Sequence, residues 1–243
     1  GYTSPAYLLQ PKIIYSYNET KGCQIKRNGN CEGSISGFTH GNGMAFMFWL
    51  RMPPSFIDTG AGGSTQDVSI FRTYTSSTKS FISSDVFVRR RSVTVGMFTS
   101  HYFDLGIRRY WQGGTGNYRE TIYSNFFGNT AFGGGGFTAY GNDKWNHFYL
   151  NFGDTTTSSW FLRTNGQTNS LSNTNDATTN GWIPDGNTGI GGRTKTNTTG
   201  GNPGTLRAIG YIQVNPTANM EIMIDELAIF DENSFGGQKV PSP

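Results

Sequence analysis

The sequence predicts an all-β protein, an antiparallel β-sandwich, on three observations. The 243 residues include 34 Gly and 14% aromatic residues, but only 14% charged residues. Asn, Thr and Ser fill much of the remainder, which favours short strands joined by many turns. Apolar residues do not recur with a period of 3.6, which disfavours long helices. The chain is long enough to bury one large core, and no repeat or clear linker divides it, so we expect one domain.

Residues 44–52 form the clearest predicted strand. They are a nearly continuous apolar run that ends at Pro53-Pro54, where a sheet ladder loses its donors. An apolar segment at 13–17 precedes them. Apolar or alternating segments predict further strands at 68–74, 86–91, 93–98, 118–127, 144–152, 159–163, 206–214 and 220–230. Segments 165–181 and 194–204 are rich in Ser, Thr, Asn and Gly, and we expect them to be surface loops.

The last predicted strand is broken only by the pair Asp225-Glu226. On a regular strand the two side chains point to opposite faces unless a bulge intervenes. A carboxylate buried in this strand would need hydrogen-bonding partners. We therefore expect a structural role, in which these acids cap loops and accept backbone hydrogen bonds.

The two cysteines, Cys23 and Cys31, flank the turn signal Asn28-Gly29. Asn-Gly favours a β-hairpin because both residues tolerate positive φ. A hairpin would bring the two thiols near each other and allow a disulfide. Two free thiols in a reducing compartment are the alternative, since one pair of cysteines leaves both open.

The charge pattern argues against a nucleic-acid partner. The formal net charge is +3 and the pI ≈ 8.8, whereas a nucleic-acid binder concentrates basic residues on one surface. The basic runs are 89–91 and 108–109. On a strand, Arg89 and Arg91 point to one face and Arg90 to the other, so the triplet is not one patch. We interpret it as a charged strand rather than an anion site.

Several features predict an extracellular or particle-surface location. No apolar run approaches the ~20 residues of a membrane-spanning helix, and no signal peptide is present. The chain begins at Gly1, as a processed or trimmed chain would. Asn18 and Asn197 lie in sequons, which are glycosylated only after secretion through a eukaryotic pathway.

Five segments, 46–51, 144–150, 160–166, 188–192 and 223–230, follow one another in a familiar order. They contain an aromatic-Trp-basic strand, Lys-Trp-x-His, a hairpin ending in Asn-Gly, Ile-Gly-Gly and Ile-Asp-Glu. Together they resemble laminin-G-like domains of the concanavalin A-like lectin/glucanase superfamily. The resemblance implies a jelly-roll sandwich over 44–231, with an N-terminal arm and cysteine hairpin at 1–43 integral to it and a tail at 232–243. The superfamily holds lectins, adhesion modules, hydrolases and scaffold proteins, so it does not name a ligand.

The sequence argues against catalysis. Glycosidases of the superfamily carry Glu-x-Asp-x-Glu or Glu-x-Asp-x-x-Glu on one strand, but here Met223 stands between Glu221 and Asp225. Residues four apart on a strand lie ~13 Å apart, whereas glycosidase carboxyl pairs need about 5–9.5 Å. The three histidines His40, His101 and His147 lack a recognisable nucleophile for a triad. Only fragments of a polysaccharide-lyase motif occur. We therefore expect a non-catalytic protein.

Aromatic and amide side chains in the loops predict a glycan-binding or adhesion surface, since sugars stack on aromatic faces and bond to Asn and Asp. The candidates are Tyr110, Trp111, Gln112, Tyr140, Asn142, Asp143 and Trp182. Trp111 and Trp182 have a second interpretation, in which they close the core at loop bases. Calcium is a candidate cofactor, with Asp58, Asp67 and Asp143 as oxygen donors, although no compact acidic loop holds them.

The alternative hypothesis is a structural subunit of a capsid, fibre or filament. Residues 1–9 carry apolar side chains that could pair with the sheet edge of a second copy. An edge strand of the same domain explains this arm equally well. Glycans or glycoproteins and self-association are therefore the predicted partners.

Overall fold

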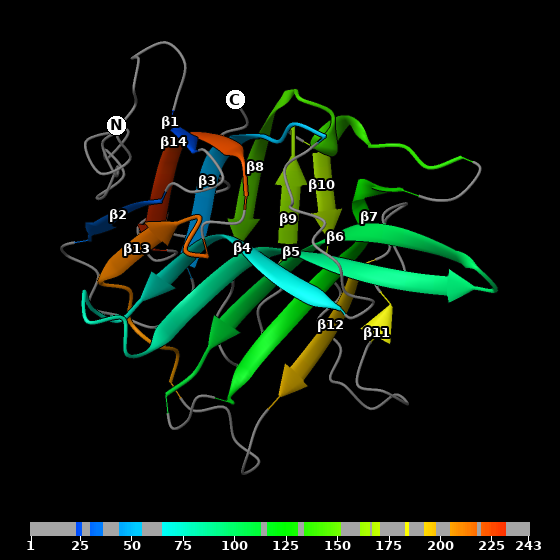
Figure 1. The fold of residues 1–243 in the computed structure, drawn as a ribbon. Helices are drawn as coiled ribbons and strands as arrows, with labels where there is room; N and C mark the ends of the chain where they lie inside the picture. Colours follow the sequence, from blue (N-terminus) through cyan, green and yellow to red (C-terminus); the bar gives the residue numbers. More distant parts are fainter. Residues whose placement is uncertain are drawn as a thin grey trace.

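The chain forms two antiparallel sheets that pack face to face (Figure 1). A computed structural model describes residues 23–25, 30–35, 44–54, 65–112, 116–130, 134–151, 161–165, 167–170, 183–184, 192–197, 205–217 and 220–231. Every strand pair in them is antiparallel. The predicted fold class, an all-β antiparallel sandwich, is confirmed.

The smaller sheet has six strands, in the order β1 (Cys23–Ile25), β14 (Ile222–Asp231), β3 (Met44–Arg51), β8 (Trp145–Asn151), β9 (Phe161–Thr164) and β10 (Gln167–Ser170). The larger sheet has eight, in the order β11 (Ile183–Pro184), β12 (Gly192–Asn197), β7 (Tyr118–Thr130), β6 (Phe98–Tyr110), β5 (Ile82–Val95), β4 (Gln66–Tyr74), β13 (Tyr211–Val214) and β2 (Cys31–Ser34). A single 3-10 turn, η1 (Ala139–Gly141), precedes β8 in the described residues.

The core lies between the sheets and is rich in aromatic rings. Phe46 and Phe48 of β3 contact Phe71 of β4, with ring centroids 5.5 and 5.2 Å apart. Phe48 also stacks on Phe148 of β8 at 5.2 Å. Side chains alternate between the two faces of a strand, so the residues between these core positions point away from the opposite sheet. That outer face of the eight-stranded sheet carries the site described below.

The predicted cysteine hairpin is wrong. β1, which holds Cys23, pairs with β14 in the six-stranded sheet, whereas β2, which holds Cys31, pairs with β13 in the eight-stranded sheet. β1 and β2 therefore belong to different sheets and do not form a hairpin with each other. The side chain of Cys23 lies outside the described residues, so the disulfide stays a prediction.

Two other sequence predictions are also corrected. The strand expected at 86–91 continues to Val95 as β5, whereas the strand expected at 93–98 is interrupted by the turn at Gly96-Met97 and its last residue begins β6. β6 was not predicted, although its buried Phe103, Leu105 and Ile107 alternate with Asp104, Gly106 and Arg108 of the outer face. Parts of the expected loops 165–181 and 194–204 form β10 and β12, which extend the sheets at their edges.

A β-bulge lies at the acidic pair of β14. The register with β3 shifts between Asp225 and Ala228, and Glu226 has a φ of 48°. Asp225 is half-buried because it alternates with the buried Ile222 and Ile224, and the bulge turns Glu226 to an exposed position. The Glu226 N–H donates to Asp225 Oδ1 at 2.9 Å. The expected hydrogen bond to the backbone is present, and neither acid is fully buried.

Some predictions lie outside the described residues. These are the arm at 1–9, the sequon residue Asn18 and the tail at 232–243. Asn197 ends β12, but its side chain is outside the described ones. Pairing of the arm with a second copy therefore stays a prediction. In the described part of the chain, no helix is long and apolar enough to cross a membrane.

Candidate functional site

The outer face of the eight-stranded sheet carries a row of charged and polar side chains, one from each of six neighbouring strands. Cross-strand pairing from β7 to β2 places in this row Glu120, Arg108, Asp85, Arg72, Gln213 and Glu32. The first four alternate in sign. Opposite charges that face each other across strands stabilise a sheet, so these pairs favour the observed register of the four strands.

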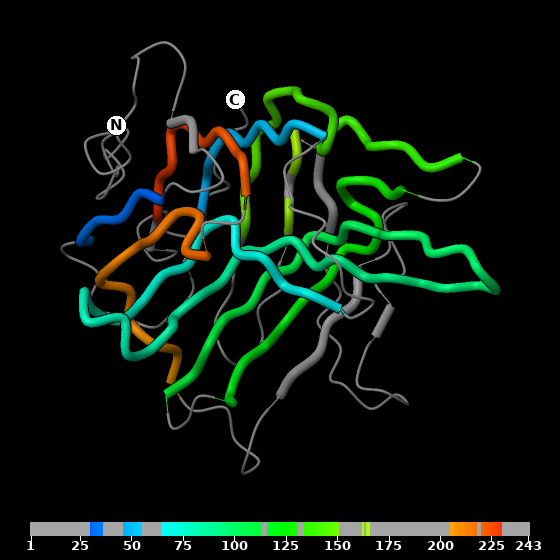
Figure 2. The backbone as a smooth tube through the Cα atoms, in the orientation of Figure 1, coloured from blue at the N-terminus to red at the C-terminus, as the bar shows by residue number. Residues whose placement is uncertain are grey.

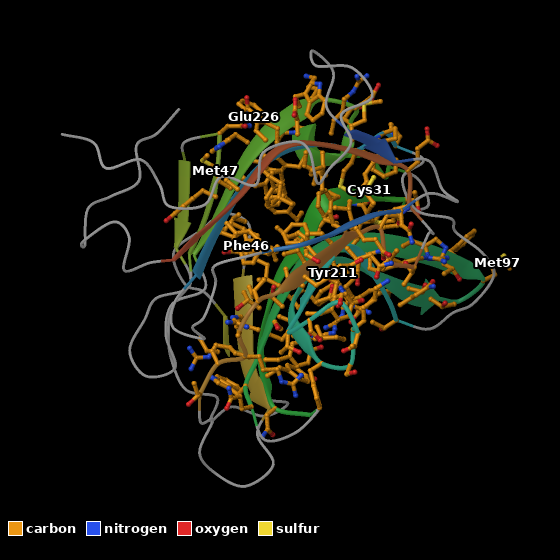
Figure 3. The ribbon with its side chains drawn as sticks, turned by 90° about the vertical axis from the view of Figure 1, so that its left-hand side faces the viewer. Cys31, Phe46, Met47, Met97, Tyr211 and Glu226 are labelled. Carbon is orange, nitrogen blue, oxygen red and sulfur yellow. The ribbon has the colours of Figure 1, made fainter. Side chains whose placement is uncertain are left out.

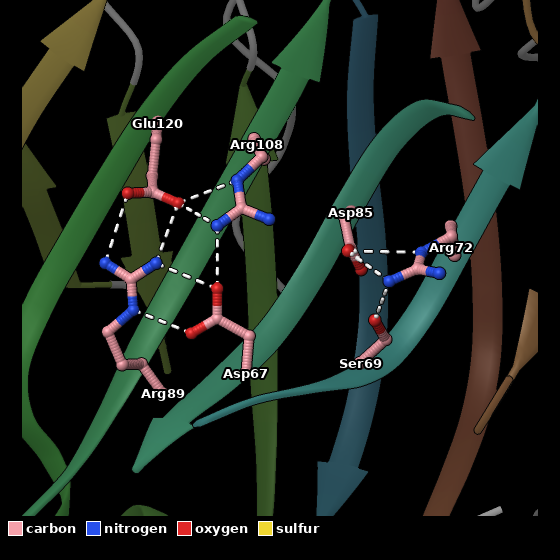
Figure 4. Close-up of polar contacts among 7 residues, drawn as sticks. All are labelled: Asp67, Ser69, Arg72, Asp85, Arg89, Arg108 and Glu120. Carbon is pink, nitrogen blue, oxygen red and sulfur yellow. Dashed lines mark hydrogen bonds and ion pairs between the residues drawn. The ribbon is translucent and has the colours of Figure 1, made fainter. Parts of the chain in front are cut away.

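Four residues from β4, β5, β6 and β7 form a closed ion cluster: Asp67, Arg89, Arg108 and Glu120 (Figure 4). Arg89 Nε and Nη2 donate to the two Asp67 oxygens at 2.7 and 2.8 Å. Arg89 Nη1 and Nη2 also donate to the two Glu120 oxygens at 3.1 and 3.0 Å. Arg108 joins the same carboxylates, since Nη2 donates to Asp67 Oδ2 and Nε to Glu120 Oε2, each at 2.7 Å. Each carboxylate thus binds both guanidinium groups.

Aromatic rings pack against the two guanidinium groups of the ion cluster. The guanidinium carbon of Arg108 lies 4.4 Å from the Phe87 ring centroid and 5.1 Å from that of Tyr118. The Arg89 guanidinium lies 5.4 Å from the Phe87 centroid. Phe87 is fully buried, although it lies on the face away from the core. Cation–π contacts of this kind, together with bidentate hydrogen bonds, fix both the position and the plane of a guanidinium.

The ion cluster is largely shielded from solvent. The side chain of Glu120 is 3% exposed, those of Arg108 and Arg89 14% and 15%, and that of Asp67 28%. Burial alone would raise the pKa of Asp67, but hydrogen bonds and charge from Arg89 and Arg108 outweigh it and lower that pKa. Burial likewise opposes the charge on the two arginines, yet Glu120 and Asp67 raise their pKa values. Asp67, Arg89 and Arg108 are therefore held in their ionised forms.

The neighbouring pair Asp85–Arg72 differs from the ion cluster. Arg72 Nε and Nη2 donate to one Asp85 oxygen, Oδ2, at 3.1 and 2.8 Å. The other oxygen, Oδ1, is buried without a hydrogen-bond partner. Burial raises the pKa of Asp85, although Arg72 opposes the shift. The ion pairs of Asp67 therefore outweigh its desolvation, whereas the single ion pair of Asp85 does not.

This arrangement can present fixed donors and acceptors, but it is poorly suited to proton transfer. A general acid or base needs a carboxyl whose pKa lies near the working pH. Asp67 is held ionised, and both Asp67 and Glu120 already accept from two arginines. Such groups can instead receive a ligand hydroxyl without reorganising.

The predicted group at residues 110–112 is mostly buried. Trp111 is 1% exposed and forms a bridge with Leu206, so its interpretation as a residue that closes the core is the one the structure supports. Tyr110 is buried under the Arg207 guanidinium, which lies 5.6 Å from its ring centroid. Gln112 is exposed, and its backbone N–H donates to the Thr205 carbonyl at 2.8 Å.

The predicted group at residues 140–143 lies elsewhere. Tyr140 stacks on Phe126 with centroids 4.4 Å apart, and its hydroxyl lies 2.9 Å from that of Thr164. Asn142 and Asp143 are exposed. Along β7, Tyr118 pairs with Tyr110 while Phe126 contacts Tyr140, and eight residues of strand span ~26 Å. The structure does not bring the two groups together, and Trp182 lies outside the described residues.

The candidate calcium donors are also separated. Asp67 belongs to the ion cluster, whereas Asp143 accepts two hydrogen bonds of 2.8 Å from Arg51 of the six-stranded sheet. Asp58 lies outside the described residues. Within the described ranges, no group of three or more His, Cys, Asp and Glu residues could hold a metal ion. The two aspartates that the structure describes therefore do not share a site.

The ion cluster was not predicted as a site: the sequence indicated only Asp67 as a candidate metal ligand, and Arg89 and Arg108 as members of two basic runs. Arg89 does point to the opposite face from Arg90, as predicted; Arg90 is buried and its Nη2 lies 3.1 Å from His101 Nε2. A usable signal was present, because Asp85 and Arg89, and likewise Asp104 and Arg108, lie four apart and so share one face of a strand.

Comparison with known proteins gives distant structural likenesses. No protein family model matches the chain, and neither does any curated protein. The globular domain of Trypanosoma cruzi calreticulin matches with a TM-score of 0.42 and 7% identity over 90% of this chain and 87% of that chain. Mouse laminin α1 domains LG4-5 match with a TM-score of 0.37 and 9% identity, over 100% of this chain and 48% of theirs. A β-porphyranase from the gut bacterium Bacteroides plebeius matches with a TM-score of 0.33 and 8% identity, over 84% and 66%.

A laminin domain pair, of the kind that the sequence motifs resemble, is thus among the similar solved structures. At these TM-scores the likenesses carry no conclusion about ligand or reaction. The architecture rests on the two antiparallel sheets themselves.

Proposed function

We propose that this chain is a non-catalytic β-sandwich module that binds glycans on the outer face of its eight-stranded sheet, in an extracellular or particle-surface setting. The observation that carries the proposal is the ion cluster of Asp67, Arg89, Arg108 and Glu120, held against Phe87 and Tyr118. The proposal moves the site from the predicted loops to the sheet, because the predicted loop residues are separated or buried.

The chemistry of the ion cluster suits sugar hydroxyls. A sugar presents several hydroxyl groups at fixed spacing and an apolar C–H face, and binding sites recognise it with a few fixed polar groups beside aromatic rings. Asp67 is the most exposed member of the ion cluster, and the half-buried Tyr118 ring lies beside it across Arg108. The positive and negative charges of the cluster balance, so the face favours neutral sugars over strongly charged polymers.

The absence of catalysis is part of the proposal. Two arginines occupy each carboxylate of the ion cluster, and the lowered pKa of Asp67 keeps it from donating a proton at neutral pH. Glu221 and Asp225 lack the third acid of the glycosidase motif, and the bulge at Asp225 breaks the regular strand that such a motif requires.

A glycan array tests the proposal. The wild-type chain, assayed with and without a chelator, is expected to bind one or more neutral glycans, and the chelator arm reports any need for calcium. For a glycan that binds, Asp67→Asn and Tyr118→Ala are each expected to weaken binding about tenfold, the loss of one good polar or stacking contact. Lys79→Gln is the matched control, because Lys79 pairs with Glu32 at the far end of the row.

Thermal melting of each variant separates lost binding from lost folding. Background signal on the whole array would overturn the proposal. Equal weakening by Lys79→Gln in a folded protein would place the site elsewhere.

A further inference from the structure

The β5–β6 hairpin projects beyond the rest of the sheet (Figure 2). β5 and β6 remain paired up to Val95 and Phe98. In the described part of the chain, the pairing of β4 with β5 ends at Arg90, and that of β7 with β6 ends at His101. The ten residues 91–100 therefore extend as a two-stranded ribbon. Gly96, with a φ of 63°, occupies the first turn position, as a type II′ turn requires.

The end of this ribbon is apolar and exposed. Met97 is 87% exposed and Val95 73%, while Phe98 and Val93 are 43% and 42% exposed. Met97 lies at the far end of the hairpin (Figure 3). Val95 faces Phe98, and Val93 lies two residues from Val95, so three of the four share one face of the ribbon. No charged residue occurs from position 92 to position 100.

Behind the apolar end lies an aromatic and basic pair. Arg91 faces Tyr102 on the same side of the ribbon, and its guanidinium lies 5.2 Å from the Tyr102 ring centroid. Arg91 also donates from Nη2 to Asp104 Oδ1 at 3.0 Å. Arg91 precedes Val95 by four residues, or ~13 Å of strand. Membrane-binding segments place apolar side chains in the hydrocarbon and tyrosine and arginine at the level of the headgroups. The end of the ribbon has the same order of residues.

We propose that the β5–β6 hairpin inserts its tip, residues 93–98, into the interfacial region of a lipid bilayer. Apolar segments that lie in this region penetrate about 5–10 Å, which would submerge the tip and leave Arg91 and Tyr102 among the headgroups. Deeper insertion is disfavoured, because the outer edges of a two-stranded ribbon carry backbone groups that hydrocarbon cannot satisfy.

A bilayer suits this tip better than a protein partner does. A stable protein interface buries about 800 Å² on each partner, and four side chains at the end of a narrow ribbon cannot supply that area. The tip carries no charge, so the docking depends on apolar contact. We therefore expect it to occur on zwitterionic lipid, with little effect of anionic lipid or salt.

Vesicle co-sedimentation tests this inference. The wild-type chain is expected to sediment with phosphatidylcholine vesicles and with vesicles that also contain phosphatidylserine, to a similar extent. The double variant Val95→Ser, Met97→Ser is expected to lose partitioning by more than about tenfold, since burial of each apolar side chain alone contributes a factor of about that size. Both positions are exposed, so the variant keeps its fold, which circular dichroism checks.

Phe81→Ser is the matched control. Phe81 is 50% exposed and lies just before β5, at the opposite end of the strand from the tip, and its replacement is expected to leave sedimentation unchanged. A second readout is Met97→Trp, whose fluorescence is expected to shift to the blue on vesicle addition, unlike that of Phe81→Trp.

Three results would overturn the inference. The first is a wild-type chain that sediments with neither vesicle. The second is an equal loss of partitioning in Phe81→Ser and in the double variant. The third is a wild-type dimer that becomes monomeric in the double variant without any lipid binding, which would make a second copy the occupant of the tip.

Discussion

The ring of Phe87 lies directly against Gly106, where an added Cβ would come within 2.2 Å of two ring carbons. Gly106→Ala must therefore displace the ring that supports Arg108 and Arg89. We expect it to lower the free energy of unfolding by about 2 kcal/mol, the range of an overpacked buried site. Urea denaturation measures the change. Gly134→Ala is the control, because an added Cβ meets nothing within 4 Å there; equal urea midpoints for the two variants would contradict the account.

Asp67→Asn tests the ionised state of the ion cluster. The pKa of Asp67 is lowered in the folded chain, so its ion pairs stabilise the fold above the unfolded pKa of about 3.9 and lose their effect as the pH falls through the folded pKa. We expect the variant to be less stable than the wild type by roughly 1 kcal/mol at neutral pH. This difference in stability between the variant and the wild type should disappear at acidic pH. Unfolding curves between neutral pH and pH ~3 check this, and a gap independent of pH would argue against the assignment.

Asp85→Asn is expected to show the opposite trend. Burial raises the pKa of Asp85, so the ionised carboxylate costs stability above the unfolded pKa, and protonation relieves that cost as the pH falls. Asparagine mimics the neutral acid at every pH. The stability of the variant relative to the wild type should therefore improve as the pH rises. The same unfolding series measures it, with Asp67→Asn as the counterpart; parallel trends in the two variants would refute the distinction between these aspartates.

A bond between Cys23 and Cys31 would join β1 of one sheet to β2 of the other. We expect an alkylating reagent to modify neither cysteine before reduction and both after it, as read by mass spectrometry. Reduction should then lower the free energy of unfolding by about 2–3 kcal/mol, the usual effect of a short disulfide loop. Full alkylation of the unreduced, denatured chain would show two free thiols.

Apolar patterning predicted most of the sandwich. The runs at 44–52, 68–74 and 118–127 are strands because their core-facing side chains recur or run on without interruption. β6 escaped prediction although its buried Phe103, Leu105 and Ile107 alternate with polar residues. The charges of Asp104 and Arg108 on its outer face are balanced by partners on three other strands, β4, β5 and β7.

The site could not be predicted from one strand at a time. Arg89 is four residues from Asp85 on its own strand, yet its carboxylate partners are Asp67 and Glu120 on two other strands. Their meeting depends on the register of four strands and on the bulge between Ser69 and Phe71. A bulge also determined the exposure of Glu226, which regular alternation after Ile222 and Ile224 would have placed on the buried face. Local patterns do not encode such shifts.

The ion cluster also has a consequence for the folding kinetics. It joins position 67 to position 120 through two intervening strands, so it can close only after four strands are in register. Contacts of long sequence separation are costly to form early. Arg89→Lys, which loses the paired hydrogen bonds, should therefore accelerate unfolding while refolding keeps nearly its original rate. The cluster would then slow unfolding and so prolong the lifetime of the folded sheet.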